Sequence, residues 1–346
     1  MMTLLKPKWF MLLAILASCS YSDAQNATPP AATISNTHAV LPGKGLQQHD
    51  FLYTGEWDYR KTVQTIYIIR KGKIAWTYDI PFHDPTTGDM EELGDATMRP
   101  NGNVTFCRKT GASEVTPDRK IIWNYEALKG TEIHSVEPIG DDKILLVING
   151  ATATIKLINI KSGQTEKETT LPTGGPKPHG QFRRVRITEA GTLLAAHMDA
   201  GKVTEYDWNG KELWTINVKS PWLATRLKNG NTLITSNNGF VIEVNQQGET
   251  VWEINQKDLP EFKLYIPQVA VRLANGNTVI TNWCPNGIKK PEDWPGSVQL
   301  LEVTPDKKLV WALSQWSEPD LGPASSIQLL DEPMIKKSKG YLKEYQ

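Results

Sequence analysis

The sequence has no excess of charge of either sign, because 38 Lys and Arg residues balance 38 Asp and Glu residues. A chain without a net field has no general electrostatic attraction for nucleic acid or for an anionic membrane face. Metal-ligand spacings, phosphate-binding glycine loops and nucleophile-elbow motifs are also absent from the sequence. We therefore expect no nucleic-acid partner, no metal and no cofactor from motifs alone.

Long apolar runs are scarce too. The run from Phe10 to Ala17 follows Lys6 and Lys8 and is too short to span a bilayer, which is typical of an export signal. Residues 16–19 read Leu-Ala-Ser-Cys and resemble the bacterial lipobox, which implies a signal peptide over residues 1–18 and a lipid on Cys19. Cleavage after Ala24 is the alternative.

Both readings place the mature protein outside the cytoplasm, in the periplasm or at the cell surface. With a lipid on Cys19, the protein would be anchored to the outer membrane and would touch the membrane only through that lipid. Residues 19–47 are rich in Ala, Thr, Pro and Asn without periodicity and are expected to form a flexible tether. A single folded domain is expected over residues 48–335, followed by a polar tail over 336–346.

Cysteine is the rarest informative residue, with three in the chain. Apart from Cys19, only Cys107 and Cys284 remain, and two cysteines in an oxidising compartment could form a disulfide. The repeat described next places them in units that are not neighbours. We therefore expect two free, buried thiols.

What the sequence has instead is an internal repeat. Residues 226–235, 239–244 and 248–252 contain short β-branched and apolar runs separated by Asn-Gly and other glycine turns. The Asn-Gly pair favours a tight hairpin, and the runs have strand length without a helical period. Four short strands in about 40–45 residues are the signature of a propeller blade. The unit recurs at residues 98–123, 138–167, 187–214 and 271–311.

A sixth unit is split between the two ends of the chain. Residues 51–54, 65–69 and 73–76 supply three strands, and residues 325–330 supply the missing inner one. Pairing these strands would remove the open sheet edge that otherwise promotes aggregation. The sequence therefore predicts an all-β, six-bladed β-propeller of four-stranded blades, closed by its N- and C-terminal strands.

A tryptophan ends most of the units and resembles the docking tryptophan of the quinoprotein-type (PQQ-like) propeller repeat. Its expected role is structural, as a wedge between neighbouring blades. The residues concerned are Trp76, Trp123, Trp214, Trp252 and Trp311.

Three kinds of protein share this repeat. Quinone-dependent dehydrogenases carry an adjacent Cys-Cys pair, which this chain lacks, so we do not expect the quinone cofactor. Resemblance to the outer-membrane assembly lipoprotein implies work through exposed loops and contacts with envelope proteins. Resemblance to six-bladed arylsulfotransferase-like propellers implies a histidine at the channel mouth that carries a sulfuryl group.

Alignment of the repeats on Trp222 identifies one position of every inner strand. These positions should form a ring around the central channel, and they are Gly94, His134, Arg183, Trp222, Gln268 and Ser325. Such a mixture of donors, a titratable base and a stacking surface is unusual for a purely structural ring. It predicts that a polar, anionic small molecule or glycan binds at the channel mouth. The expected ligand-binding residues are Glu92, Asp95, His134, Arg183, Arg184, Trp222 and Gln268.

Other interpretations stay open. In an enzyme that acts on a sugar-like substrate as a sulfuryl or other group transferase, hydrolase or lyase, His134 would be the base or nucleophile, and Arg183 would stabilise developing negative charge. Charged pairs such as Arg183 with Glu92 could instead only tie blades together. The protein could also be a scaffold for envelope assembly or protein interaction.

Overall fold

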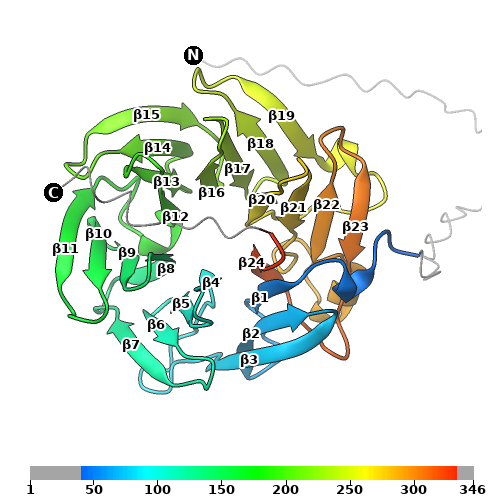
Figure 1. Ribbon diagram of the computed structural model, residues 1–346, viewed down its shortest axis with the longest axis horizontal. Coiled ribbons are helices and arrows are strands. Elements are labelled where there is room, and N and C mark those ends of the chain that lie inside the picture. Colours follow the sequence, from blue (N-terminus) through cyan, green and yellow to red (C-terminus); the bar gives the residue numbers. More distant parts are fainter. Residues whose placement is uncertain (1–39, 333–346) are drawn as a thin grey trace, which may run out of the picture. The chain divides into compact units, whose positions relative to one another are not determined.

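Six antiparallel sheets of four strands surround a central channel in the computed structural model, which describes residues 40–332 (Figure 1). The six-bladed, all-β architecture expected from the repeats is therefore confirmed. The signal peptide, Cys19, Ala24 and the tail 336–346 lie outside the described residues. Within residues 40–332, no helix has the length and apolar character needed to cross a membrane.

We number the sheets as blades 1 to 6 and give their strands from the channel outward. Blade 1 consists of β24 (Ala324–Leu329), β1 (Phe51–Gly55), β2 (Val63–Arg70) and β3 (Lys73–Pro81). Blade 2 consists of β4 (Ala96–Met98), β5 (Val104–Arg108), β6 (Gly111–Val115) and β7 (Ile121–Glu126). Blade 3 consists of β8 (Glu132–Ile139), β9 (Lys143–Asn149), β10 (Ala153–Asn159) and β11 (Thr165–Leu171). Blade 4 consists of β12 (Phe182–Ile187), β13 (Leu193–His197), β14 (Lys202–Tyr206) and β15 (Glu212–Asn217). Blade 5 consists of β16 (Pro221–Arg226), β17 (Thr232–Ser236), β18 (Phe240–Val244) and β19 (Thr250–Asn255). Blade 6 consists of β20 (Ala270–Arg272), β21 (Thr278–Thr281), β22 (Leu300–Val303) and β23 (Leu309–Leu313). Short 3-10 helices lie in the connections: η1 (Gly45–Gln47), η2 (Pro178–Gly180), η3 (Gln256–Asp258) and η4 (Pro291–Gly296).

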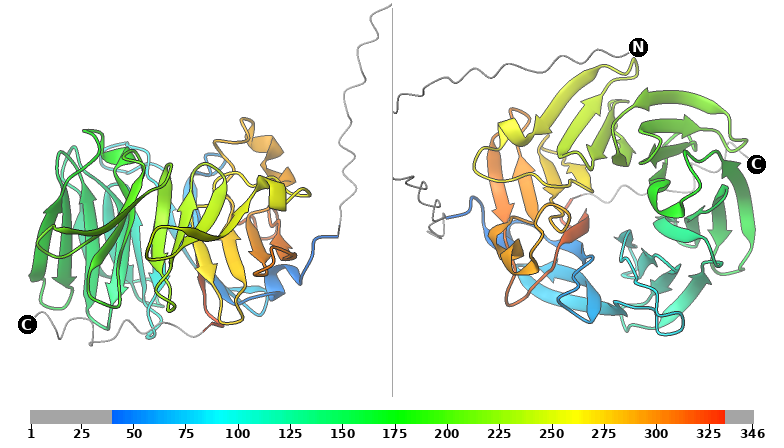
Figure 2. Two further views of the ribbon diagram at one scale, coloured as in Figure 1. Left: turned by 90° about the horizontal axis from the view of Figure 1, so that it is seen from above. Right: turned by 180° about the vertical axis from the view of Figure 1, so that it is seen from behind.

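The ring closes in blade 1, as expected. The C-terminal strand β24 pairs antiparallel with β1, with Phe51 opposite Leu329 and Tyr53 opposite Ile327 (Figures 1 and 2). Tyr53 is fully buried, and its hydroxyl donates a hydrogen bond of 2.6 Å to the carbonyl of Gly322. Two parts of the sequence that are more than 260 residues apart therefore form one sheet.

The docking tryptophans join neighbouring blades through their indole N–H groups. Trp76 of blade 1 donates to the carbonyl of Pro117 in blade 2 at 2.8 Å. Trp214 of blade 4 donates to Gln246 in blade 5 at 3.0 Å, and Trp252 of blade 5 donates to Pro305 in blade 6 at 2.9 Å. Each ring thus packs beside a hairpin turn of the next blade and also satisfies its only polar group.

The last tryptophan contacts a segment expected to be tether. Trp311 Nε1 donates to the carbonyl of Gly45 at 3.0 Å, and the backbone N–H of Ala312 donates to Pro42 at 3.1 Å. Contacts with the propeller therefore begin near Pro42, ahead of the expected domain boundary at residue 48.

An ion pair accompanies the tryptophan at two of these joints. Arg226 pairs with Glu205 of the preceding blade and lies over the Trp214 ring at 5.0 Å. Arg272 repeats this arrangement with Glu243, at 2.8 Å, and with the Trp252 ring. The guanidinium groups combine an ion pair with a cation–π contact, which strengthens the joint between blades.

The joint that closes the ring uses histidine in place of arginine. His49 Nε2 lies 3.1 Å from Glu302 Oε2, and its ring is T-shaped to Trp311 at 5.3 Å. Its Nδ1 lies 3.0 Å from a carboxylate oxygen of Asp331, just after the C-terminal strand. A titratable group therefore takes the role that Arg226 and Arg272 have at two other joints.

The two cysteines in the described residues behave as expected. Cys107 lies in β5 of blade 2 and Cys284 follows β21 of blade 6. Both thiols are buried and free, which confirms the prediction. Burial raises the pKa of Cys107 to about 12, so this thiol is unreactive.

Candidate ligand site in the central channel

Four of the six positions identified by the repeat alignment share one backbone feature, a β-bulge in the inner strand, whereas Gly94 and Gln268 lie two residues before β4 and β20. His134, Arg183 and Trp222 are each the extra residue where the register with the second strand shifts. Ser325 occupies the same place in β24. A bulge inserts one unpaired residue and changes the direction of its side chain. The repeated bulge thus redirects one side chain in each of these four inner strands.

The ring side chains are packed and not open to solvent. The exposed fractions of His134, Arg183, Trp222 and Gln268 are 1%, 2%, 6% and 1%. The guanidinium carbon of Arg183 lies 4.0 Å from the centre of the Trp222 ring, in the cation–π arrangement. Together with the buried residues Glu92 and Arg184, these four side chains form a packed layer across the channel, which we call the ring layer.

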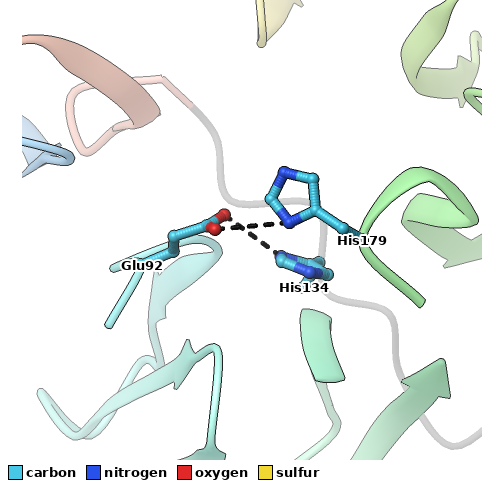
Figure 3. A group of neighbouring side chains, drawn as sticks. All are labelled: Glu92, His134 and His179. Carbon is cyan, nitrogen blue, oxygen red and sulfur yellow. Dashed lines mark ion pairs between the residues drawn. The ribbon is translucent and has the colours of Figure 1, made fainter. Parts of the chain in front are cut away.

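Charged groups concentrate in one sector of this layer (Figure 3). His134 Nε2 lies 2.8 Å from Glu132 Oε2, and His134 Nδ1 lies 3.6 Å from Glu92 Oε2. Glu92, in the loop before β4, also pairs with Arg183 at 3.4 Å. His179, from η2, lies across His134, with ring centres 5.3 Å apart and planes at 88°. Residues from blades 2, 3 and 4 thus meet at one point.

Burial and charge set the protonation of this sector. Burial and the neighbouring charge of Arg183 lower the pKa of His134 to about 4, although Glu132 and Glu92 oppose this change. The imidazole is therefore neutral at pH 7. The hydrogen bond to Glu132 raises the pKa of His179, whose side chain is 53% exposed. The pKa values of the two histidines are thus shifted in opposite directions.

Two other predicted residues, Asp95 and Arg184, form a second charged cluster with Arg186. Asp95 accepts a bidentate pair of hydrogen bonds from Arg186, at 2.7 and 2.9 Å. Arg184 approaches the same carboxylate at 3.6 Å and donates to the backbone carbonyl of His134. Burial opposes ionisation of Asp95, but Arg184 and Arg186 outweigh it and lower the pKa of this carboxyl group. Arg184 is itself 1% exposed, so its role within the described residues is to support the layer.

A cavity of about 1500 Å³ adjoins the ring layer and extends to the hairpin turns at the ends of the inner strands. All six blades contribute to its lining. Asp95, Leu223, Val269 and Ser326 line it, and each directly follows a ring residue in the sequence. Of the predicted ligand-binding residues, Asp95 lines the cavity, whereas the others lie in the layer beside it: Glu92, His134, Arg183, Arg184, Trp222 and Gln268.

Three residues that the structure places at these sites are not among the expected ligand-binding residues. Arg186 lines the cavity as the partner of Asp95, and its position three residues after Arg183 was the available signal. His179 and Glu132 complete the charged sector. Glu132 is two residues from His134, but only the folded loop between blades 3 and 4 brings His179 against His134.

The fold defines a six-bladed propeller, and its docking tryptophans resemble those of the quinoprotein-type repeat. Residues 151–284 match the family model described as outer membrane protein assembly factor BamB, which confirms the resemblance over that part of the chain. Curated proteins include no match to this chain.

Solved structures support the same fold. A protein of unknown function from Bacteroides caccae superposes with a TM-score of 0.68 and 24% identity, over 81% of this chain and 97% of that one. A catalytically inactive virginiamycin B lyase from Staphylococcus aureus, solved with quinupristin, gives a TM-score of 0.52 and 13% identity over 79% and 87%. A streptogramin B lyase structure gives 0.51 and 12%, over 77% and 84%. At these identities the similarity establishes the propeller fold and no activity.

Proposed function

We propose that this propeller binds a polar small molecule or a glycan in its central cavity. The observation that carries the proposal is the cavity itself, which has a volume of about 1500 Å³ and is lined by all six blades. Concave sites of this kind, with apolar walls and a few fixed polar groups, are where proteins bind small ligands. Leu223, Val269 and Val271 supply apolar wall, and Asp95 with Arg186 supplies polar groups near the ring layer.

The charges of the lining favour a hydroxylated ligand. Arg186 is paired with Asp95, Arg226 with Glu205 and Arg272 with Glu243, so these guanidinium groups are already neutralised. A strongly anionic ligand would have to compete with these carboxylates. A sugar can instead donate to carboxylate oxygens, accept from guanidinium N–H groups and pack its apolar face on aliphatic side chains. Acidic sugars remain within the proposal as ligands that add one charge.

An exported, envelope location is part of this proposal. It is supported by the similarity of residues 151–284 to a family named for outer-membrane protein assembly, together with the signal-like N-terminal sequence.

The same similarity supports a second candidate, a scaffold that acts in envelope assembly. A scaffold would be expected to present one continuous exposed apolar surface. The large exposed apolar side chains of the described outer strands occur one or two to a strand, on four different blades: Ile74, Ile121, Ile122, Leu213 and Val251. This distribution favours ligand binding over the scaffold.

A thermal-shift screen tests the proposal, because a ligand that binds only the native state raises the melting temperature. The probes are glucose, N-acetylglucosamine, glucuronate and N-acetylglucosamine 6-sulfate, each as monosaccharide and as a short oligosaccharide. We expect at least one to raise the melting temperature of the native protein. Thr225→Trp places an indole in the cavity from β16 and should abolish that rise. An undiminished rise in Thr225→Trp, or no rise with any probe, would contradict the proposal.

A further inference from the structure

The atoms around His134 pose an electrostatic problem. His134 Nε2 is 2.8 Å from Glu132 Oε2, so this nitrogen is the one that donates a proton to the carboxylate. Nδ1 is the ring nitrogen left to bind another group, and the atom it approaches is Glu92 Oε2, at 3.6 Å. This separation is too long for a hydrogen bond, and both atoms are electron donors. A cation between them would turn this repulsion into attraction.

His179 supplies a third donor to the same point when metal binding displaces the proton from its Nδ1. Its Nδ1 lies 3.3 Å from Glu92 Oε1 and 3.3 Å from Glu132 Oε2. One donor atom each from Glu92, His134 and His179 lie within 4.8 Å of one another (Figure 3). We propose that these three residues form a site for a divalent transition metal of the kind that Zn²⁺ occupies.

The donor distances fit this assignment. Zinc bonds of about 2.0–2.1 Å in tetrahedral geometry place donor atoms roughly 3.3 Å apart. Each oxygen of Glu92 faces one imidazole at a separation close to this value, Oε2 at 3.6 Å from His134 Nδ1 and Oε1 at 3.3 Å from His179 Nδ1. His179 is half exposed, so its side chain can turn to complete the geometry without disturbing the packed ring. Two imidazoles and one carboxylate also prefer zinc and related metals over Mg²⁺ or Ca²⁺.

The residues around the three donors orient the His134 ring and set the local charge. Glu132 accepts from His134 Nε2, which fixes the ring and leaves Nδ1 free to bind metal, as carboxylates commonly do behind metal-binding histidines. Arg183, 3.4 Å from Glu92, and Lys109, 3.9 Å from Glu132, oppose an added cation. The carboxylates of Glu92 and Glu132 offset these two positive charges. The local field therefore does not exclude a divalent ion.

Three protein donors leave the fourth position of a tetrahedral ion open, as in catalytic and ligand-binding zinc sites. That position would take water or an oxygen of a bound molecule. The sequence motifs predicted no metal, because the ligands are 42 and 45 residues apart along the chain and share no local spacing. The proposal does not depend on a ligand in the cavity, since the cavity-lining residues include none of the three.

Calorimetric titration of the metal-stripped protein with Zn²⁺ tests this site. We expect one ion per chain, bound more tightly than Mg²⁺. His179→Ala removes an exposed ligand and should weaken zinc binding more than about 100-fold, and Glu132→Gln should weaken it about 10–100-fold. His83→Ala, which removes another exposed imidazole, should bind like the native protein.

Melting temperatures measured without metal distinguish the loss of a metal ligand from misfolding of the variant. His179 is exposed, so its alanine variant should melt close to the native protein in the absence of zinc. Zinc should then raise the melting temperature of the native protein and of His83→Ala, but not of His179→Ala. Equal zinc affinity in the native protein and His179→Ala would overturn the assignment. No zinc binding by the native protein, or tighter binding of Mg²⁺, would overturn it as well.

Discussion

Arg183 stacks on Trp222 with its guanidinium carbon 4.0 Å from the ring centre, although the two residues lie on neighbouring blades. The same guanidinium pairs with Glu92 of blade 2 and donates to the backbone carbonyl of His179 at 2.9 Å. One side chain therefore links three blades across the channel. The ring layer is thus both a joint between blades and the boundary of the cavity.

The Arg183–Glu92 pair should be strongly coupled. Arg183→Met leaves a buried carboxylate without its guanidinium partner, which typically costs about 3–5 kcal/mol of unfolding free energy. Urea denaturation of this variant, of Glu92→Gln and of the double variant measures the coupling. We expect the double variant to be more stable than the sum of the two single losses predicts. Simple additivity would show that the pair is not a unit.

Glu56 should make stability fall as the pH rises from about 4.5 to about 7. Burial and the nearby charge of Glu92 raise the pKa of Glu56 from 4.5 to about 7, although Arg183, Ser325 and Arg184 oppose the rise. The folded state therefore holds a proton that the unfolded chain has lost. The stabilisation of the folded state by this proton is fully present below pH 4.5 and disappears as the pH rises through about 7.

Glu56→Gln removes that titration. We expect unfolding free energies measured between pH 5 and pH 8 to vary less in Glu56→Gln than in the native protein, by up to about 3 kcal/mol. At pH 8 the variant should be the more stable of the two. A native protein and variant with parallel pH profiles would show that Glu56 ionises normally.

His49 should give the closing joint its own pH dependence. Burial opposes the charged imidazolium, but hydrogen bonds to Glu302 and Asp331 outweigh it and raise the pKa of His49 above 6.5. The stabilisation is complete below pH 6.5 and is lost as the pH rises through the folded-state pKa. Because Arg226 and Arg272 fill this place at other joints, His49→Arg should keep the pairing at all pH values.

The measurement is the melting temperature from pH 5 to pH 9. His49→Ala should lower the unfolding free energy by about 1–2 kcal/mol at pH 5, with a matching fall in melting temperature. The loss should be much smaller at pH 9, because the charged hydrogen bonds are absent there in both proteins. His49→Arg should match the native protein at pH 5 and exceed it at pH 9. A loss in His49→Ala that is the same at both pH values would contradict the role of the charge.

The blades, their closure and the ring positions could be predicted from sequence because each rests on a local signal. Asn-Gly turns fix hairpins, and Trp214 and Trp252 end their units at the same position. Given this register, the alignment on Trp222 placed His134 and Arg183 at the bulges that the structure shows. Repetition converts a one-dimensional pattern into a set of equivalent positions in space.

The packing of the side chains at the ring positions could not be predicted in the same way. Equivalent positions do not reveal whether side chains leave an opening, and here Arg183 and Trp222 stack into a packed layer. The approach of His179 to His134 depends on the path of a loop that lacks repeat symmetry. The pairing of Asp95 with Arg186 depends on how far blades 2 and 4 converge, which no local pattern encodes.

Calorimetric titration with the probe that stabilises the native protein most tests the central claim, binding in the cavity, most directly. The native protein should bind one molecule per chain, and so should Thr250→Trp, which carries its new indole on the exposed outer strand β19. Thr225→Trp, with the indole in the cavity, should bind at least about tenfold more weakly. Equal affinity in Thr225→Trp and the native protein would contradict binding in the central cavity.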